Sequence, residues 1–129
     1  MMTSGQASLA LGTVQFGLNY GITNNHGRVS IDEVKNILAL ASSSGVEYLD
    51  TAQAYGNSES VVGSSMPLNS PFRLVSKLSA QLSDNSDYLS LASHWQASFD
   101  HSLDRLGVKS LDSLLVHNYL SGSENALEI

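Results

Sequence analysis

Short apolar segments alternate with helix-like segments along this chain, and that alternation limits the fold more than any other feature of the sequence. Buried strands are predicted over residues 9–17, 46–50, 72–78 and 113–117. Helical patterns lie between them, and this order predicts parallel strands joined by right-handed crossovers. We therefore expect an α/β protein, built either as an open doubly wound sheet or as part of a (β/α)8 barrel.

The clearest helix follows a loop rich in glycine and asparagine. Ser30 and Glu33 have the spacing of a capping box, and Gly45 lies where a C-terminal cap is expected. Between them, apolar residues recur with helical spacing at Val34, Ile37, Leu38 and Ala41.

Two further helices complete the three predicted crossovers. A short helix is expected over residues 58–65, and a longer one from about Tyr88 to the glycine at 107. The longer helix carries an apolar stripe that we expect to pack on the sheet: Leu91, Trp95, Phe99, Leu103 and Leu106. Residues 120–129 show no clear pattern.

Composition narrows the classes of partner. The formal net charge is -6 and the few basic residues are scattered, which argues against nucleic acid or an anionic membrane as the main partner. No apolar run approaches the roughly 18 residues of a membrane span. The chain has no cysteine, which suits a reducing compartment, so a cytoplasmic protein is expected.

Reactive side chains fall where the predicted strands end. Asp50, Lys77 and His117 lie at or near the C-terminal ends of the second, third and fourth strands, and Tyr55 lies in the loop after Asp50. Parallel strands bring these ends to one rim, which is where ligands bind in barrels and open α/β sheets.

Such a group of side chains suits the reduction of a carbonyl. A lysine ammonium beside a tyrosine favours the phenolate and makes the hydroxyl a better proton donor. A carboxylate can hold the ammonium in place, and a neutral imidazole can donate a hydrogen bond to a carbonyl oxygen. No side chain donates hydride, so a nicotinamide cofactor would have to supply it.

These residues also carry a resemblance to a known family. The segment "DTAQAYGNSE" resembles the Asp-Thr-Ala-x-x-Tyr-Gly-x-Ser-Glu signature of the aldo-keto reductases. "LGTVQFG" looks like the first barrel strand of that family, "FRLVSKL" is similar to its third strand, and "SFDHSLDRLGVKSLDSLLVHNY" is similar to the helix and strand that follow.

The resemblance implies a fold, an activity and a cofactor. The catalytic residues would be Asp50, Tyr55 as proton donor, Lys77 and His117, acting on a small aldehyde or ketone. Gly12, Thr13 and Asp50 would lie near the nicotinamide of NADPH. The opening "GTVQFGLNYGI" is most similar to bacterial members among sugar and surface-polysaccharide enzymes.

The length of the chain limits this interpretation. A complete (β/α)8 barrel takes about 250 residues. We therefore expect residues 1–129 to form one partial domain, the N-terminal half of a barrel with about four parallel strands and three crossover helices, truncated after the fourth strand.

Two alternatives to a reductase remain. One is a non-catalytic half barrel that self-associates through its exposed strand edges or binds a partner. The other is a doubly wound binding protein, which is disfavoured because the region of Gly12 lacks a Gly-x-Gly-x-x-Gly turn. His94, His101 and Asp104 share a helical face, but they are expected to be a polar solvent face and not a metal site.

Overall fold

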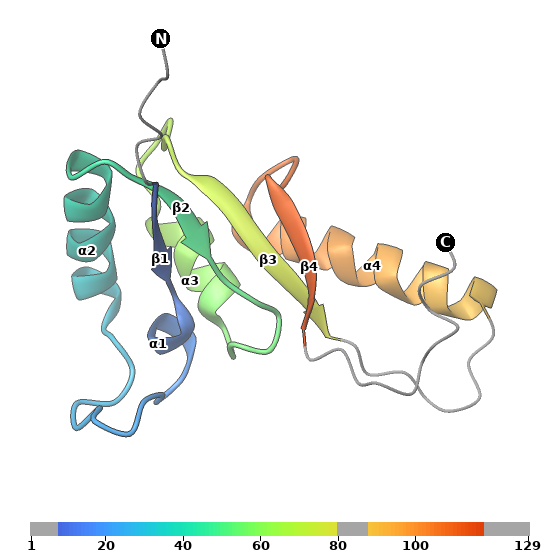
Figure 1. Cartoon of the computed structure of the whole chain (residues 1–129), viewed down its shortest axis with the longest axis horizontal. Coiled ribbons are helices and arrows are strands. Elements are labelled where there is room, and N and C mark those ends of the chain that lie inside the picture. Colours follow the sequence, from blue (N-terminus) through green and yellow to red (C-terminus); the bar gives the residue numbers. More distant parts are fainter. Residues whose placement is uncertain (1–7, 80–87, 118–129) are drawn as a thin grey trace, which may run out of the picture.

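The computed structural model describes residues 8–79 and 88–117. Its elements are β1 (Leu9–Gly12), α1 (Val14–Gly17), α2 (Ile31–Ser43), β2 (Val46–Asp50), α3 (Ser58–Ser65), β3 (Arg73–Ser79), α4 (Tyr88–Leu106) and β4 (Ser113–His117). The four strands form one sheet in the order β1-β2-β3-β4, and every pairing is parallel (Figure 1).

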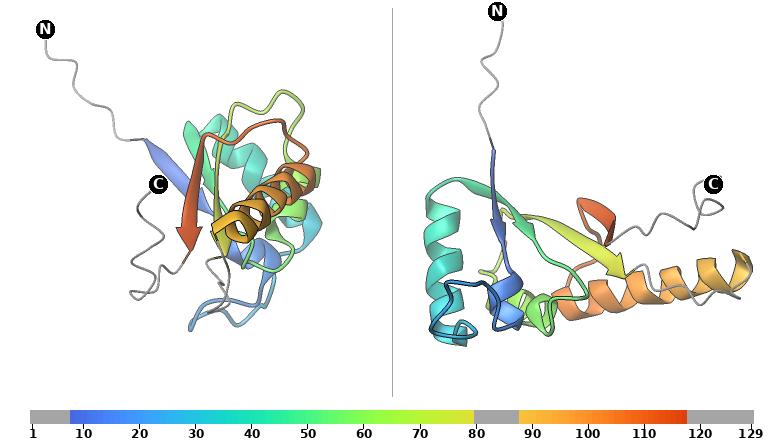
Figure 2. Two further views of the ribbon diagram at one scale, coloured as in Figure 1. Left: turned by 90° about the vertical axis from the view of Figure 1, so that its right-hand side faces the viewer. Right: turned by 60° about the horizontal axis from the view of Figure 1, so that its bottom comes forward.

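This strand order decides between the two predicted architectures. Each crossover leads to the next strand in the same direction, and right-handed crossovers then place every helix on the same face of the sheet. Figure 2 shows α2, α3 and α4 together on one side of the strands. A doubly wound sheet needs a reversal of strand order, and the described strands contain none. The described chain therefore has the arrangement of the first half of a (β/α)8 barrel.

The first predicted strand was too long. The strand ends at Gly12, and residues 14–17 form the single helical turn α1. The backbone turns at this point because the Phe16 N–H donates to the Thr13 carbonyl over 2.9 Å. Phe16 is only 4% exposed, so the apolar character of the segment reflects a buried turn and not additional strand.

The other predicted elements are confirmed within one or two residues. The Ser30 side chain accepts a hydrogen bond from the Glu33 N–H, 3.3 Å away, and so caps α2 as the capping box predicts. Gly45 follows α2 with a φ angle of 80°, a conformation that glycine adopts without strain. The third strand begins one residue later than predicted, at Arg73.

The hydrophobic core lies between the sheet and the helices. Leu49 of β2 and Leu74 of β3 face the helices and are 0% and 6% exposed. They pack against apolar residues of the surrounding helices: Phe16, Val34, Leu38, Val61, Val62 and Leu106. Since side chains alternate along a strand, the opposite face carries Asp50, Lys77 and His117. We call this opposite face the inner face.

Coverage of the sheet is incomplete at β4. Leu114, Leu115 and Val116 are 39%, 47% and 43% exposed. Of the apolar stripe predicted on α4, Leu106 is buried, and the other members are only partly buried: Leu91, Trp95, Phe99 and Leu103. There an open groove of about 330 Å³, the α4 groove, separates the helix from β3 and β4, and it is lined by Leu78, Leu91, Ala92, Trp95, Gln96, Phe99 and Leu114.

Candidate active site

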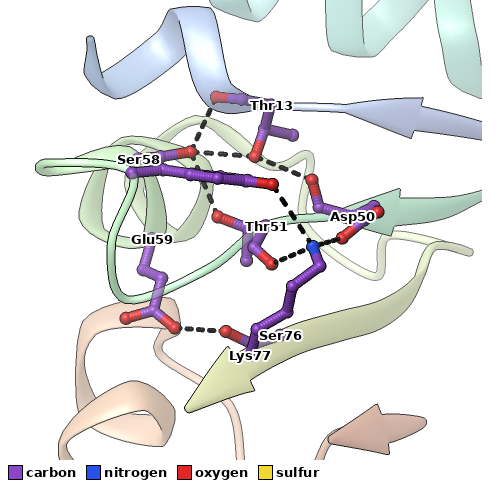
Figure 3. Close-up of polar contacts among 8 residues, drawn as sticks. Thr13, Asp50, Thr51, Ser58, Glu59, Ser76 and Lys77 are labelled. Atoms are coloured by element: carbon purple, nitrogen blue, oxygen red, sulfur yellow. Dashed lines mark hydrogen bonds and ion pairs between the residues drawn. The ribbon is translucent and has the colours of Figure 1, made fainter. Parts of the chain in front are cut away.

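Lys77 lies at the centre of the polar cluster on the inner face. Its ammonium forms an ion pair with Asp50 and donates to the Thr51 carbonyl over 3.0 Å (Figure 3). The Tyr55 hydroxyl oxygen lies 3.5 Å from the same nitrogen. The Lys77 side chain is 14% exposed and that of Asp50 is 41% exposed, so the ammonium is shielded while the carboxylate borders the open inner face.

His117 completes the group that the sequence predicted. Its ring meets the Tyr55 ring edge-on, with the centroids 5.6 Å apart and the planes at 88°. The Lys77 ammonium lies 5.1 Å from the centroid of the same tyrosine ring. Nδ1 of His117 is buried, and no described residue gives it a hydrogen-bond partner. The four predicted catalytic residues are therefore neighbours, while their catalytic roles stay predictions.

The loop that carries Tyr55 is held by two glycines that touch backbone to backbone. A Cβ atom at Gly17 would lie 1.8 Å from the Tyr55 carbonyl oxygen and 2.5 Å from the Ser58 nitrogen. A Cβ atom at Gly56, where φ is 60°, would lie 2.6 Å from the Gly17 carbonyl oxygen. Only glycine fits at this crossing of α1 and the loop, which fixes the backbone on either side of Tyr55.

Buried hydroxyl groups tie this loop to the first two strands. Thr13, Thr51 and Ser58 are each 0% exposed. Ser58 Oγ donates to the Thr13 carbonyl over 2.8 Å and accepts from Thr51 Oγ1 over 3.1 Å (Figure 3). Thr13 Oγ1 donates to the Asp50 carbonyl over 3.1 Å. Thr51 and Ser58 were not predicted from the sequence to belong to the site, although both lie inside the "DTAQAYGNSE" segment.

A second buried group, also missed from the sequence, lies on the helix side of β3. Glu59 is 2% exposed and accepts hydrogen bonds from Ser76 Oγ over 2.6 Å and from Arg105 Nε over 2.7 Å. Gln53 adds a separate link to α4, because its Nε2 donates to the Ser98 carbonyl and to Ser102 Oγ, both over 2.9 Å. Both ends of the loop are therefore anchored to α4.

The residues predicted to bind a cofactor differ in exposure. Gly12 pairs with Asp50 in the sheet, and a Cβ atom there would meet nothing within 4 Å. Gly12 therefore borders open surface beside the Asp50 carboxylate, and its role in cofactor binding stays a prediction. Thr13 is fully buried and its hydroxyl bonds within the protein, so it supports the site from behind. A direct role for Thr13 in cofactor binding stays a prediction.

Residues 8–79 and 88–117 contain no group of three or more side chains placed to hold a metal ion, and His94 and His101 are both exposed on α4. Among the described helices, none combines the length and the apolar character that crossing a membrane requires.

The strands are parallel and in sequential order, which defines a protein of the (β/α)8-barrel class. Ionisable side chains gather at the C-terminal ends of these strands and form a candidate site on the inner rim. Comparison with known families then identifies the family. The model of the aldo/keto reductase family matches residues 8–121, so the chain belongs to this family of oxidoreductases.

Solved structures agree with this assignment. Two structures of Pseudomonas aeruginosa proteins assigned to the aldo-keto reductases are 34% and 33% identical over 87% of this chain, with TM-scores of 0.70 and 0.66. The chain spans 43% and 42% of their lengths. An aldose reductase from Giardia lamblia shares the fold, at 16% identity over 85% of this chain and 32% of its own, with a TM-score of 0.52. No match was found among curated protein sequences.

Proposed function

We propose that this chain carries the carbonyl-reducing site of an NADPH-dependent oxidoreductase, which converts an aldehyde or a ketone to an alcohol. The observation that carries the proposal is the position of the Lys77 ammonium, paired with Asp50 and 3.5 Å from the Tyr55 hydroxyl. Membership of the aldo/keto reductase family supports it. The absence of cysteine suits a cytoplasmic setting, which is part of the proposal.

Tyr55 is the proton donor in this proposal. Its hydroxyl gives a proton to the carbonyl oxygen of the substrate, and the nearby Lys77 ammonium stabilises the negative charge left on the phenolate. Asp50 holds the ammonium in place through their ion pair. The half-buried His117 ring, edge-on to Tyr55, orients the carbonyl oxygen by a hydrogen bond.

The nicotinamide of NADPH would lie on the open surface beside Gly12 and Asp50. When bound, the cofactor supplies hydride to the carbonyl carbon, which completes the reduction to an alcohol. Gly12 leaves room for the ring, since no atom beyond the glycine and its two chain neighbours lies within 4 Å of the place a Cβ would take. The Asp50 carboxylate, 41% exposed, can accept a hydrogen bond on the same surface.

A Tyr55→Phe variant tests this proposal. Turnover of aldehydes with NADPH should fall by about 100-fold or more, because the proton donor is lost while the ring remains. Binding of NADPH, measured by fluorescence titration, should stay unchanged. The matched control is Tyr48→Phe, since Tyr48 lies on β2 under Arg73, whose guanidinium carbon is 5.0 Å from the ring centroid.

Two results would contradict the proposal. Retained turnover in Tyr55→Phe would remove Tyr55 from the chemistry. Failure of the wild-type chain to bind NADPH or to reduce any aldehyde or ketone would reject the activity for this chain.

A second candidate function is self-association of the half barrel, in which a second copy covers the open sheet. Among the described strands, β1 and β4 each pair with one neighbour only, so each offers one free edge for parallel pairing. The exposed apolar residues of β4, Leu114, Leu115 and Val116, lie at one of these edges. Two copies related by two-fold symmetry would join each β4 to the other copy's β1.

A further inference from the structure

Glu59 is a buried carboxylate that the proposed chemistry does not use. It is 2% exposed and lies in the first turn of α3. A buried charge is unfavourable unless it is paired and hydrogen-bonded, and here both carboxylate oxygens have partners. Oε1 accepts from Ser76 Oγ over 2.6 Å, and Oε2 accepts from Arg105 Nε over 2.7 Å.

The partners of Glu59 connect the strand that carries Lys77 with the loop that carries Tyr55. Ser76 is the residue before Lys77 on β3, and neighbouring strand residues point to opposite faces. A hydrogen bond on the helix side at Ser76 therefore fixes the backbone from which Lys77 projects on the inner side. Glu59 itself follows the loop that carries Tyr55.

The other contacts of the Tyr55 loop fix different parts of it. Backbone N–H groups of Thr51 and Gln53 donate to carbonyls of β3, which fixes only the start of the loop. Ser58 ties the end of the loop to β1 and β2, through Thr13 and Thr51. Glu59 is thus the side chain that joins the end of the loop to β3.

We propose that Glu59 is a positioning residue that holds the Tyr55 hydroxyl beside the Lys77 ammonium. The inference rests on the proposed function and deepens it. The Tyr55 oxygen and the Lys77 nitrogen are 3.5 Å apart, at the outer limit of a hydrogen bond, so a small shift of α3 against β3 separates them. Arg105 compensates the charge of Glu59 from α4, with 2.6 Å between the closest ion-pair atoms.

The test uses NMR of the full 129-residue chain with labelled lysine, which gives only three lysine signals, from Lys35, Lys77 and Lys109. The Lys77 signal is assigned by a Lys77→Arg variant. The Tyr55 ring, whose centroid is 5.1 Å from Lys77 Nζ, should give a nuclear Overhauser cross-peak to the Lys77 side chain and a ring-current shift.

Two variants should lose both signals. Ser76→Ala removes the link to β3 and leaves the pair of Glu59 and Arg105 in place, and Glu59→Gln removes the charge and keeps the shape. The matched control is Arg73→Gln, which breaks the ion pair with Asp112 at the other end of β3. This control should keep the cross-peak and the shift.

The outcomes separate the inference from the proposed function. A cross-peak that persists in folded Ser76→Ala and Glu59→Gln overturns the inference, as does its absence in the wild type. If Glu59→Gln does not fold, the cross-peak in Ser76→Ala decides whether the inference holds.

In an active chain both variants should lower kcat about ten-fold or more with little change in KM, because small displacements of catalytic groups have such effects. A wild type without turnover rejects the function, while the NMR signals still decide the positioning role.

Discussion

Gly17 and Gly56 lie where two stretches of backbone touch, and this crossing fixes the backbone on either side of Tyr55. The place of a Cβ at Gly17 is occupied by backbone atoms of Tyr55 and Ser58, which cannot rotate away as a flexible side chain can. Gly12 differs, because a Cβ there would enter open space. An added methyl group should therefore destabilise the protein at Gly17 and have little effect at Gly12.

A Gly17→Ala variant should be clearly destabilised. We expect its free energy of unfolding to fall by about 1–3 kcal/mol or more, since the methyl group overlaps backbone that must shift. Urea unfolding followed by circular dichroism measures this change. Gly12→Ala is the control and should lie within about 0.5 kcal/mol of the wild type. Equal stability of the two variants would show that α1 and the Tyr55 loop are not in contact.

The sequence predicted the four central residues but not the groups that support them. Asp50, Lys77 and His117 could be found because each ends or nearly ends an apolar strand segment, which is a local pattern. Ser76 and Glu59 are 17 positions apart, and Arg105 and Glu59 are 46 apart. Contacts across such separations leave no local pattern. The one sequence signal that pointed to Glu59 was its position as the last residue of the "DTAQAYGNSE" segment.

At the scale of elements, local signals identified α2 well and α1 poorly. The capping box at Ser30 and the glycine at 45 mark both ends of α2 within the sequence itself. The helix α1 is one turn of four residues, and its apolar composition cannot be told from a strand by periodicity. Only the burial of Phe16 in the hydrophobic core distinguishes the two.

The cap of α2 gives a prediction at this scale. Replacing Ser30 by alanine removes the acceptor for the Glu33 N–H and should lower the free energy of unfolding by about 1 kcal/mol. The control is Ser43→Ala, whose hydroxyl bonds to the Leu40 carbonyl at the other end of the same helix. Thermal unfolding of both variants measures the difference. A Ser30→Ala variant as stable as Ser43→Ala would contradict the role of the cap.

For the whole molecule, the alternation of strands and helices alone could not predict the strand order, whereas the resemblance to the aldo-keto reductases predicted a half barrel, which the sequential order confirms. Alternating strands and helices suit a doubly wound sheet and a barrel equally well, because strand order is a property of tertiary packing. The structure resolves this through its sequential, parallel order. The same order leaves the inner face and β4 open, which is the basis of the self-association candidate.

Self-association has a direct spectroscopic readout in Trp95, the single tryptophan of the chain, which lines the α4 groove beside β4. If a second copy covers β4, sedimentation should show a dimer, and Trp95 emission should shift to shorter wavelength as concentration rises. Val116→Lys should give a monomer with constant emission, because it places a charge on the exposed apolar patch of β4.

The control for this experiment is Leu68→Lys, at a position that is 97% exposed and lies between α3 and β3. It should behave as the wild type. A wild-type chain that stays monomeric at every concentration would reject the second copy as the cover of β4.

The sequential strand order also has a consequence for synthesis on the ribosome. Each strand pairs with the one translated immediately before it, so the sheet can extend as the chain emerges, without waiting for a distant partner. Domains generally fold as units during synthesis, and contacts that are close in sequence form faster than distant ones. Four strands of this kind can grow one βα unit at a time, each new unit using the previous strand as its template.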